Sequence, residues 1–339
     1  MSERATVKDV ARYAGVSQGV VSRVVNPGSG PVAPQTRARV LEAIAALRYR
    51  PHSGARELKT QTTSTIGLVL ADISNEFFAG LADHLVGRAR DLDLGVLLTT
   101  TQEDPDLERA SLEMLMDKRV AGVLAAPVGE DATHWLRLRD FGVELVFLDR
   151  TLAQVPDVDV VGMDNRRAAY DATRHLLDRG HRRVALIGGP AATSTGHERI
   201  DGYRQALDEA RLPRDPALLH AVPFRGEAGV AATDALLALP DRPTAVVVGN
   251  TAVARRVVER IRERGLVVPR DLSLVVFHDL TWTSLMDPPV TVMRHDVPAL
   301  AETALQRLLI RLRTPGQLAG REFRLTSQLV ERGSVRCRS

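Results

Sequence analysis

From residue 66 onward, short apolar runs alternate with longer amphipathic segments, and this alternation constrains the fold more than any other feature. The apolar runs cover 66–70, 96–99, 120–125, 145–148, 184–187, 245–248 and 274–277. The helical patterns between them cover 78–91, 107–118, 166–179, 200–210, 226–238 and 252–264. Such alternation predicts parallel sheets covered by helices. The stretch is long enough for two such units facing each other, so a cleft between their strand ends is the expected ligand site.

The first 26 residues predict two short helices joined by a tight turn. Apolar side chains recur at helical spacing in both: Val7, Val10, Ala11 and Ala14, then Val20, Val21 and Val24. Thr6 is the expected N-cap, with Asp9 three residues on. Gly15 is expected to end the first helix because glycine tolerates a left-handed backbone, and Ser17 is expected to cap the second.

The second helix turns a polar face outward, where a recognition helix would meet base edges. This face holds Gln18, Gly19, Ser22 and Arg23. A third helix over 36–47, with Val40, Leu41, Ile44 and Leu47 on one face, would complete a compact head. An ordinary pair of core helices would show the same apolar stripes, so the interpretation also depends on charge.

Charge is concentrated at the start of the chain. Residues 1–60 hold ten Lys or Arg and four Asp or Glu, a balance of +6, and the other residues hold 35 and 38, a balance of −3. A basic head on a mildly acidic body suits a protein whose head alone meets phosphate. The single cysteine, Cys337, excludes an intramolecular disulfide and fits a reducing compartment. Without an apolar run of signal-peptide or membrane-span length, a cytoplasmic protein is expected.

Several motifs in order along the chain resemble the LacI/GalR family of bacterial transcription regulators, which includes the lactose and purine repressors. They are VKDVARYAGVSQGVVSRVVN in the head, YRP followed by AREL, IGLVLADISNEFF, LDR, GHRRVALI, ERIDGY, VPRDLS and PPVT. The resemblance spans nearly the whole chain. It implies repression by sequence-specific DNA binding rather than an enzymatic activity.

The resemblance also implies a domain layout. An all-α helix–turn–helix head would occupy 1–50, a hinge helix and linker 51–65, and a tail 333–339. Between them, 66–332 would form an α/β body like periplasmic binding proteins, with two Rossmann-like lobes built on parallel sheets. The N-lobe would take about 66–162 and 293–323, and the C-lobe about 163–292 and 324–332. The family's tetramerising tail has no counterpart before Ser339, so a homodimer on a palindromic operator is expected.

Family positions assign roles in DNA binding. Gln18, Gly19 and Arg23 fall where the family reads bases, although Gly19 departs from the usual side-chain-bearing residue and can be a neutral gap. Phosphate contacts are expected from Thr6, Ser17, Ser22 and Arg37, and Asn26 closes the motif as a further DNA-binding candidate. In the hinge, Leu58 falls where a leucine wedges the minor groove, and Ala55 is the small residue that allows close approach. Leu58 as a plain packing residue is the alternative.

Effector candidates follow the predicted strands. They are Asp72, Ser74, Asn75, Phe77, Arg150, Thr195, Arg199, Phe224, Asn250 and His278. Phe77 and Phe224 can stack on a sugar face, and guanidinium forks suit diols or carboxylates. Two positions depart from the family: Thr251 replaces an Asp, and His278 replaces an acidic residue. A sugar, a sugar phosphate, a sugar acid and another small metabolite all remain open, as does whether the effector releases or promotes operator binding.

The sequence leaves three alternative functions to consider. Gly188-Gly189-Pro190 after a strand is weak evidence for a dinucleotide enzyme, since the sequence has no GxGxxG or P-loop. No cofactor, metal or membrane partner is expected. A periplasmic sugar receptor would need an export signal where the basic head stands. A family member without ligand control, binding DNA constitutively, stays open because of Thr251 and His278.

Overall fold

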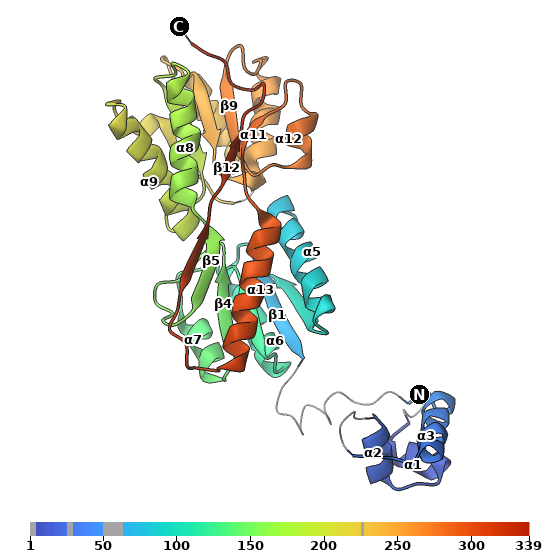
Figure 1. The fold of residues 1–339 in the computed structure, drawn as a ribbon. Coiled ribbons are helices and arrows are strands. Elements are labelled where there is room, and N and C mark those ends of the chain that lie inside the picture. Colours follow the sequence, from blue (N-terminus) through green and yellow to red (C-terminus); the bar gives the residue numbers. More distant parts are fainter. Residues whose placement is uncertain (1–4, 26–29, 50–63, 225–226, 339) are drawn as a thin grey trace. The chain divides into compact units, whose positions relative to one another are not determined.

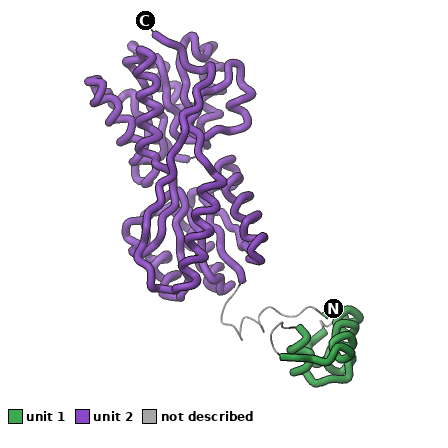
Figure 2. The backbone as a smooth tube through the Cα atoms, viewed as in Figure 1, with its two compact units in different colours: residues 1–63 green, residues 64–339 purple. Residues whose placement is uncertain are grey.

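The computed structural model describes residues 5–25, 30–49, 64–224 and 227–338. It divides into two compact units, residues 1–63 and 64–339 (Figure 2). Each is a folded body with its own buried core, so each is described by itself.

The first unit is a three-helix head: α1 (Val7–Ala14), α2 (Gln18–Val25) and α3 (Pro34–Ala46). Thr6 and Asp9 form the predicted capping box, and Gly15 ends α1 with φ 63°. The core holds Val10, Ala11, Ala14, Val21, Val24, Val40, Ala43 and Tyr49. The prediction for Leu41 was wrong: it is 50% exposed, because the buried face of α3 is centred on Val40 and Ala43.

The N-lobe of the second unit is a six-stranded parallel sheet. Its order is β11 (Glu322–Leu325), β5 (Asp159–Met163), β4 (Glu144–Leu148), β3 (Gly122–Ala125), β1 (Thr65–Leu70) and β2 (Gly95–Thr100). Helices α5 (Glu76–Asp91) and α13 (Val297–Arg313) pack on one face. Helices α6 (Pro105–Asp117) and α7 (Thr133–Asp140) pack on the other.

The C-lobe repeats this plan. Its order is β12 (Gln328–Val330), β10 (Thr291–Arg294), β9 (Ser273–Phe277), β8 (Ala245–Val248), β6 (Val184–Gly188) and β7 (Leu219–Ala221), with only β12 antiparallel. Helices α8 (Asn165–Asp178) and α9 (Ser194–Glu209) cover one face. Helices α10 (Ala228–Ala238) and α11 (Thr251–Glu263) cover the other. The short helix η1 (Pro216–Leu218) lies between α9 and β7, and α12 (Thr281–Leu285) lies between β9 and β10.

The chain passes between the lobes three times, after Met163, Arg294 and Leu325 (Figure 1). The two-lobed, parallel-sheet architecture is therefore the one predicted. Residues 333–338 pack on the C-lobe: buried Ser334 donates to the Leu274 carbonyl (2.6 Å), and the Arg338 amide donates to the Arg179 carbonyl (2.7 Å).

The apolar-run pattern missed strands β5, β7, β10, β11 and β12. Strand β5 begins with Asp159, a fully buried carboxylate paired with Arg307 and Arg311 of α13, so its sequence does not read as an apolar run. Strand β7 is three residues long and lies at the sheet edge. Among the described helices, none is long and apolar enough to cross a bilayer.

Candidate functional site

The outer face of α2 in the head is exposed as predicted. Gln18, Gly19 and Arg23 face solvent, while Val21 and Val24 on the opposite side are buried. The Arg23 Nε donates to the Gly19 carbonyl (3.3 Å), so the guanidinium lies back along the helix surface. A polar, solvent-facing helix after a tight turn has the form that enters a major groove.

The predicted phosphate-contacting residues divide into two groups. Ser17 and Arg37 are exposed, and Ser22 is half-buried. Thr6 is exposed but already caps α1: its hydroxyl donates to the Asp9 carboxylate (2.6 Å), and its hydrogen bonds lower the pKa of Asp9. Three further residues with predicted roles in DNA binding, Asn26, Ala55 and Leu58, lie outside the described residues.

The polar residues after β1 build the turn into α5. The Ser74 amide and hydroxyl both donate to Asp72 Oδ1 (2.9 and 2.7 Å). Asn75 Oδ1 accepts from the Phe77 amide (3.1 Å) and so caps α5. This turn holds the Phe77 side chain, which is 5% exposed, against the facing lobe.

Arg150 reaches from the N-lobe to an aromatic ring of the C-lobe. Its guanidinium forms a two-pronged ion pair with Glu103 (2.6 and 2.8 Å). The same group lies 4.4 Å from the Phe224 ring centroid and 5.9 Å from that of Phe78. Arg150 and Phe224, two predicted effector residues on different lobes, are thus in contact.

Arg199 of α9 lies buried at the strand ends of the C-lobe. Its Nε donates to Asn165 Oδ1 (2.9 Å) and its Nη1 to the Gly249 carbonyl (2.5 Å). Burial lowers the pKa of Arg199 to about 10, so the group remains charged at neutral pH. It also lies 4.9 Å from the Phe277 ring.

His278 packs between the lobes. Its ring lies 4.5 Å from Phe77 and 4.2 Å from His295, and His295 Nδ1 hydrogen-bonds Ser327 Oγ (2.6 Å). Burial lowers the pKa of His295 to about 3 and holds that of His278 well below 6.5, with further lowering from the neighbouring charges. Both imidazoles are therefore neutral at pH 7, so His278 offers a hydrogen bond rather than a positive charge.

Three buried polar atoms in this region have no hydrogen-bond partner among the described residues: Thr195 Oγ1, Arg150 Nε and His295 Nε2. Unpaired buried polar atoms are rare and need an explanation. Asn250, in contrast, has partners for both of its polar side-chain atoms. Its Oδ1 accepts from the Ala252 amide (3.0 Å) and so caps α11, and its Nδ2 donates to the Pro223 carbonyl (3.4 Å).

Sequence reasoning did not select four residues that complete this region: Glu103, Asp149, Asn165 and His295. Each follows a strand, namely β2, β4, β5 or β10. The rule that ligands bind at the carboxyl ends of parallel strands could have found them. Asp149 is buried, and burial raises the pKa of its carboxyl against the opposing effect of Arg199 and Arg150.

Further contacts close the two lobes on each other. The Thr151 amide donates to Ser194 Oγ (3.2 Å), and Arg324 pairs with Glu198 (2.7 Å). Four of the predicted residues, Phe77, Arg150, Phe224 and His278, therefore lie in contact where the two lobes meet.

Comparison with known proteins agrees with both units. Residues 6–52 match the family model described as bacterial regulatory proteins, lacI family, and residues 173–335 match the periplasmic binding protein-like domain. The transcriptional repressor PurR of Mannheimia succiniciproducens is 34% identical over 310 residues, covering 91% of this chain and 92% of that protein.

Two solved structures share the fold. The lac repressor dimer bound to operator and the anti-inducer ONPF matches with a TM-score of 0.85 and 25% identity, covering 98% of this chain and 100% of that one. The regulator CelR in complex with cellobiose matches with a TM-score of 0.73 and 30% identity, covering 98% and 100%.

Proposed function

This chain belongs to the LacI family of bacterial regulatory proteins, and we propose that it represses transcription from a palindromic operator, as a dimer controlled by a small-molecule effector. The head binds the duplex and the two-lobed body binds the effector. Its relatives are named as regulators of transcription, and the chain is not an enzyme.

The observation that carries the DNA-binding half is the exposed face of α2. Gln18 can donate to and accept from an adenine edge, and Arg23 can pair with guanine O6 and N7. Gly19 between them adds no side chain, so Gln18 and Arg23 carry the base readout. The basic balance of residues 1–60 supports contact with the phosphates.

Unpaired buried polar atoms where the lobes meet support the proposal that the body binds an effector. Thr195 Oγ1, Arg150 Nε and His295 Nε2 are buried without partners among the described residues, and a bound polar ligand would satisfy them. Aromatic rings from both lobes, Phe77 and Phe224, suit the face of a sugar or a related ring. The effector class we propose is a sugar or sugar derivative, as in the CelR complex with cellobiose.

The effector acts through a shift between two lobe arrangements. A ligand changes an equilibrium only by its differential affinity for the two states, and a coupling of about 1–3 kcal/mol is enough for a switch. Dimerisation would also cover exposed apolar side chains of the body, including Leu98 on edge strand β2 and Leu285, which is 79% exposed on α12.

Selection from a pool of random duplexes tests the proposal. We expect the full chain to recover a palindromic sequence, and a chain lacking residues 1–63 to recover none. Gln18→Ala should weaken binding to the recovered duplex by about 1–3 kcal/mol at fixed salt. Gln35→Ala, at the exposed start of α3, is the matched control and should bind as the wild type does.

Two results would contradict the proposal. One is full duplex affinity in the chain without its head, which would place DNA binding in the body. The other is selection of only non-palindromic sequences, together with a monomeric mass in solution, which would remove the dimer.

A further inference from the structure

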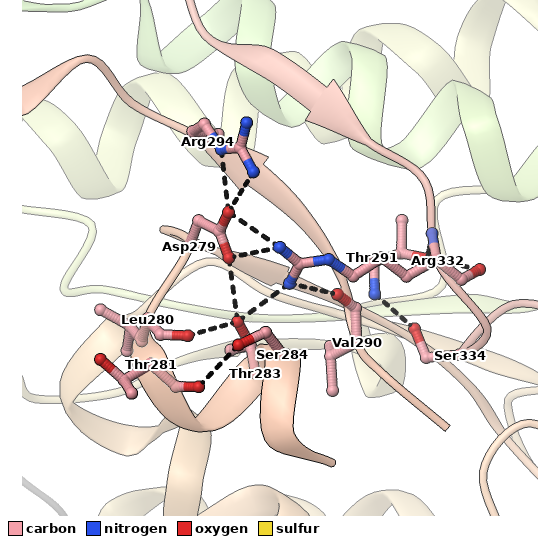
Figure 3. A network of polar contacts seen from close by, with 10 residues as sticks. All are labelled: Asp279, Leu280, Thr281, Thr283, Ser284, Val290, Thr291, Arg294, Arg332 and Ser334. Atoms are coloured by element: carbon pink, nitrogen blue, oxygen red, sulfur yellow. Dashed lines mark hydrogen bonds and ion pairs between the residues drawn. The ribbon is translucent and has the colours of Figure 1, made fainter. Parts of the chain in front are cut away.

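One carboxylate of the C-lobe holds two arginines, one at the end of β10 and one beyond β12 (Figure 3). Asp279, just beyond β9, accepts from Arg294 Nε and Nη2 (2.8 and 2.5 Å) and from Arg332 Nη2 (2.8 and 2.9 Å). Arg294 is the last residue of β10, where the chain leaves for α13. Arg332 lies two residues beyond β12, which the chain enters from β11. Asp279 therefore ties the end of β10, where one connection to the N-lobe begins, to the segment that follows β12.

The two ion pairs of Asp279, with Arg294 and with Arg332, differ in strength. Arg332 is 16% exposed, and its Nη1 also donates to the Val290 carbonyl (3.1 Å) and to Thr283 Oγ1 (3.2 Å). The Arg294 side chain is 47% exposed, and among the residues drawn in Figure 3 it contacts Asp279 alone. Exposed ion pairs are weakened by solvent and salt. The ion pair of Asp279 with Arg332 is therefore stronger than its ion pair with Arg294.

The residue before Asp279 touches the other lobe. His278 has φ 69°, a left-handed conformation that is uncommon for a residue other than glycine. Its amide donates to the Met293 carbonyl of β10 (2.9 Å), and its ring lies 4.5 Å from Phe77 of the N-lobe. The ring that touches the N-lobe and the Asp279 carboxylate therefore belong to neighbouring residues of one turn.

Another hydrogen bond joins two of the connections directly. Ser327, between β11 and β12, hydrogen-bonds His295, which directly follows β10 (2.6 Å). The ring of His295 in turn lies 4.2 Å from His278. Contacts from the cleft thus reach the connections by two routes, through His295 and through Asp279.

We propose that Asp279 is the positioning residue that couples the effector cleft to the connections between the lobes. The inference rests on the proposed function, because it assigns the residue that turns cleft occupancy into a lobe rearrangement. Coupling requires an element with two arrangements that both sites bias, and the His278–Asp279 turn touches both. Loss of the carboxylate frees Arg294 and Arg332 and loosens the closed arrangement of the lobes.

Hydrogen exchange of the full chain tests this, with Asp279→Asn as the variant. The matched control is Asp234→Asn: Asp234 of α10 also holds two arginines, Arg260 (2.7 Å) and Arg264 (2.6 Å), but lies away from the connections. The decisive peptide contains Phe77, which lies on the other lobe. We expect exchange there to rise about fivefold or more in Asp279→Asn, at the lower end of typical couplings, and to stay unchanged in Asp234→Asn.

Arg294→Gln removes only the more exposed ion pair of Asp279. It should give a smaller rise in exchange of the Phe77 peptide, and it keeps the test available if Asp279→Asn folds poorly. Faster exchange confined to the β10 and β12 segments, with the Phe77 peptide as in the control, would overturn the inference and leave Asp279 a local structural residue. Affinity for the selected duplex is the second readout. A wild type that selects no duplex refutes the proposed function alone, because the exchange comparison involves no DNA.

Discussion

At the residue scale, burial decides the charge state of the cleft more than any single neighbour does. His278 and His295 lie side by side, each less than a tenth exposed, and burial is the largest cause of the lowered pKa of both. The nearby Arg199 lowers both values further. The cleft therefore presents two neutral imidazoles beside charged guanidinium groups.

These two histidines make stability depend on pH. Their folded pKa values lie below the unfolded value of 6.5, so below pH 6.5 the unfolded chain takes up protons that the folded chain cannot. Their contribution is complete above pH 6.5 and is lost as pH falls from 6.5 toward 3. At pH 5.5 the neutral His295 costs about 1.4 kcal/mol.

Urea unfolding between pH 7.5 and 5.5 measures this cost. Between pH 7.5 and 5.5, we expect the free energy of unfolding of His295→Gln to fall by about 1 kcal/mol less than that of the wild type. His84→Gln, a change at an exposed histidine of α5, is the control and should keep the wild-type slope. Equal slopes in all three proteins would show that His295 is protonated in the folded state.

At the element scale, a glycine allows the two helices on one face of the C-lobe to touch at their backbones. A Cβ on Gly202 of α9 would lie 2.0 Å from the Arg166 carbonyl oxygen of α8. Helix α9 also carries Thr195 and Arg199, so this close packing positions two cleft residues.

Gly202→Ala should therefore destabilise the body by about 1–3 kcal/mol through overpacking. Gly80→Ala is the matched change in α5, where a Cβ would meet nothing within 4 Å, and it should stabilise by about 0.5–1 kcal/mol. Thermal unfolding of both variants measures the difference. A Gly202→Ala protein as stable as Gly80→Ala would mean that α8 and α9 separate at little cost.

At the scale of the whole molecule, two lobes of the same strand order enclose a cleft that the chain crosses three times. Contacts between the lobes include Arg324 with Glu198 and Arg150 with Phe224. An effector that binds the folded body and not the unfolded chain adds its binding energy to the stability of the body.

A thermal-shift panel of ribose, cellobiose, gluconate and glucose 6-phosphate tests effector binding. A ligand at 100 times its dissociation constant should stabilise the full chain by about 2.7 kcal/mol. Thr195→Val, which removes the unpaired buried hydroxyl, should lose that shift. Thr233→Val is the control, because the Thr233 hydroxyl already donates to the Gly229 carbonyl (2.7 Å).

A panel ligand that binds Thr195→Val as tightly as the wild type would remove Thr195 from the site. Absence of any shift with these four compounds and with further small metabolites would favour the alternative of a repressor without ligand control.

The features that sequence alone determined are local ones. The capping box of Thr6 and Asp9, the left-handed Gly15 and the strand–helix alternation all depend on residues a few positions apart. Short-range hydrogen bonds and periodic burial decide them, so they can be read from a single sequence. The exposure of Gln18, Gly19 and Arg23 followed from the same periodicity.

Only the tertiary structure decided which distant groups meet. Arg150 pairs with Glu103, 47 residues away, and Asp279 with Arg332, 53 residues away. Strand order and the three crossings bring these side chains together, and burial then sets their charge. Leu41 illustrates the same limit at short range, because which side of α3 is buried depended on how the three helices pack.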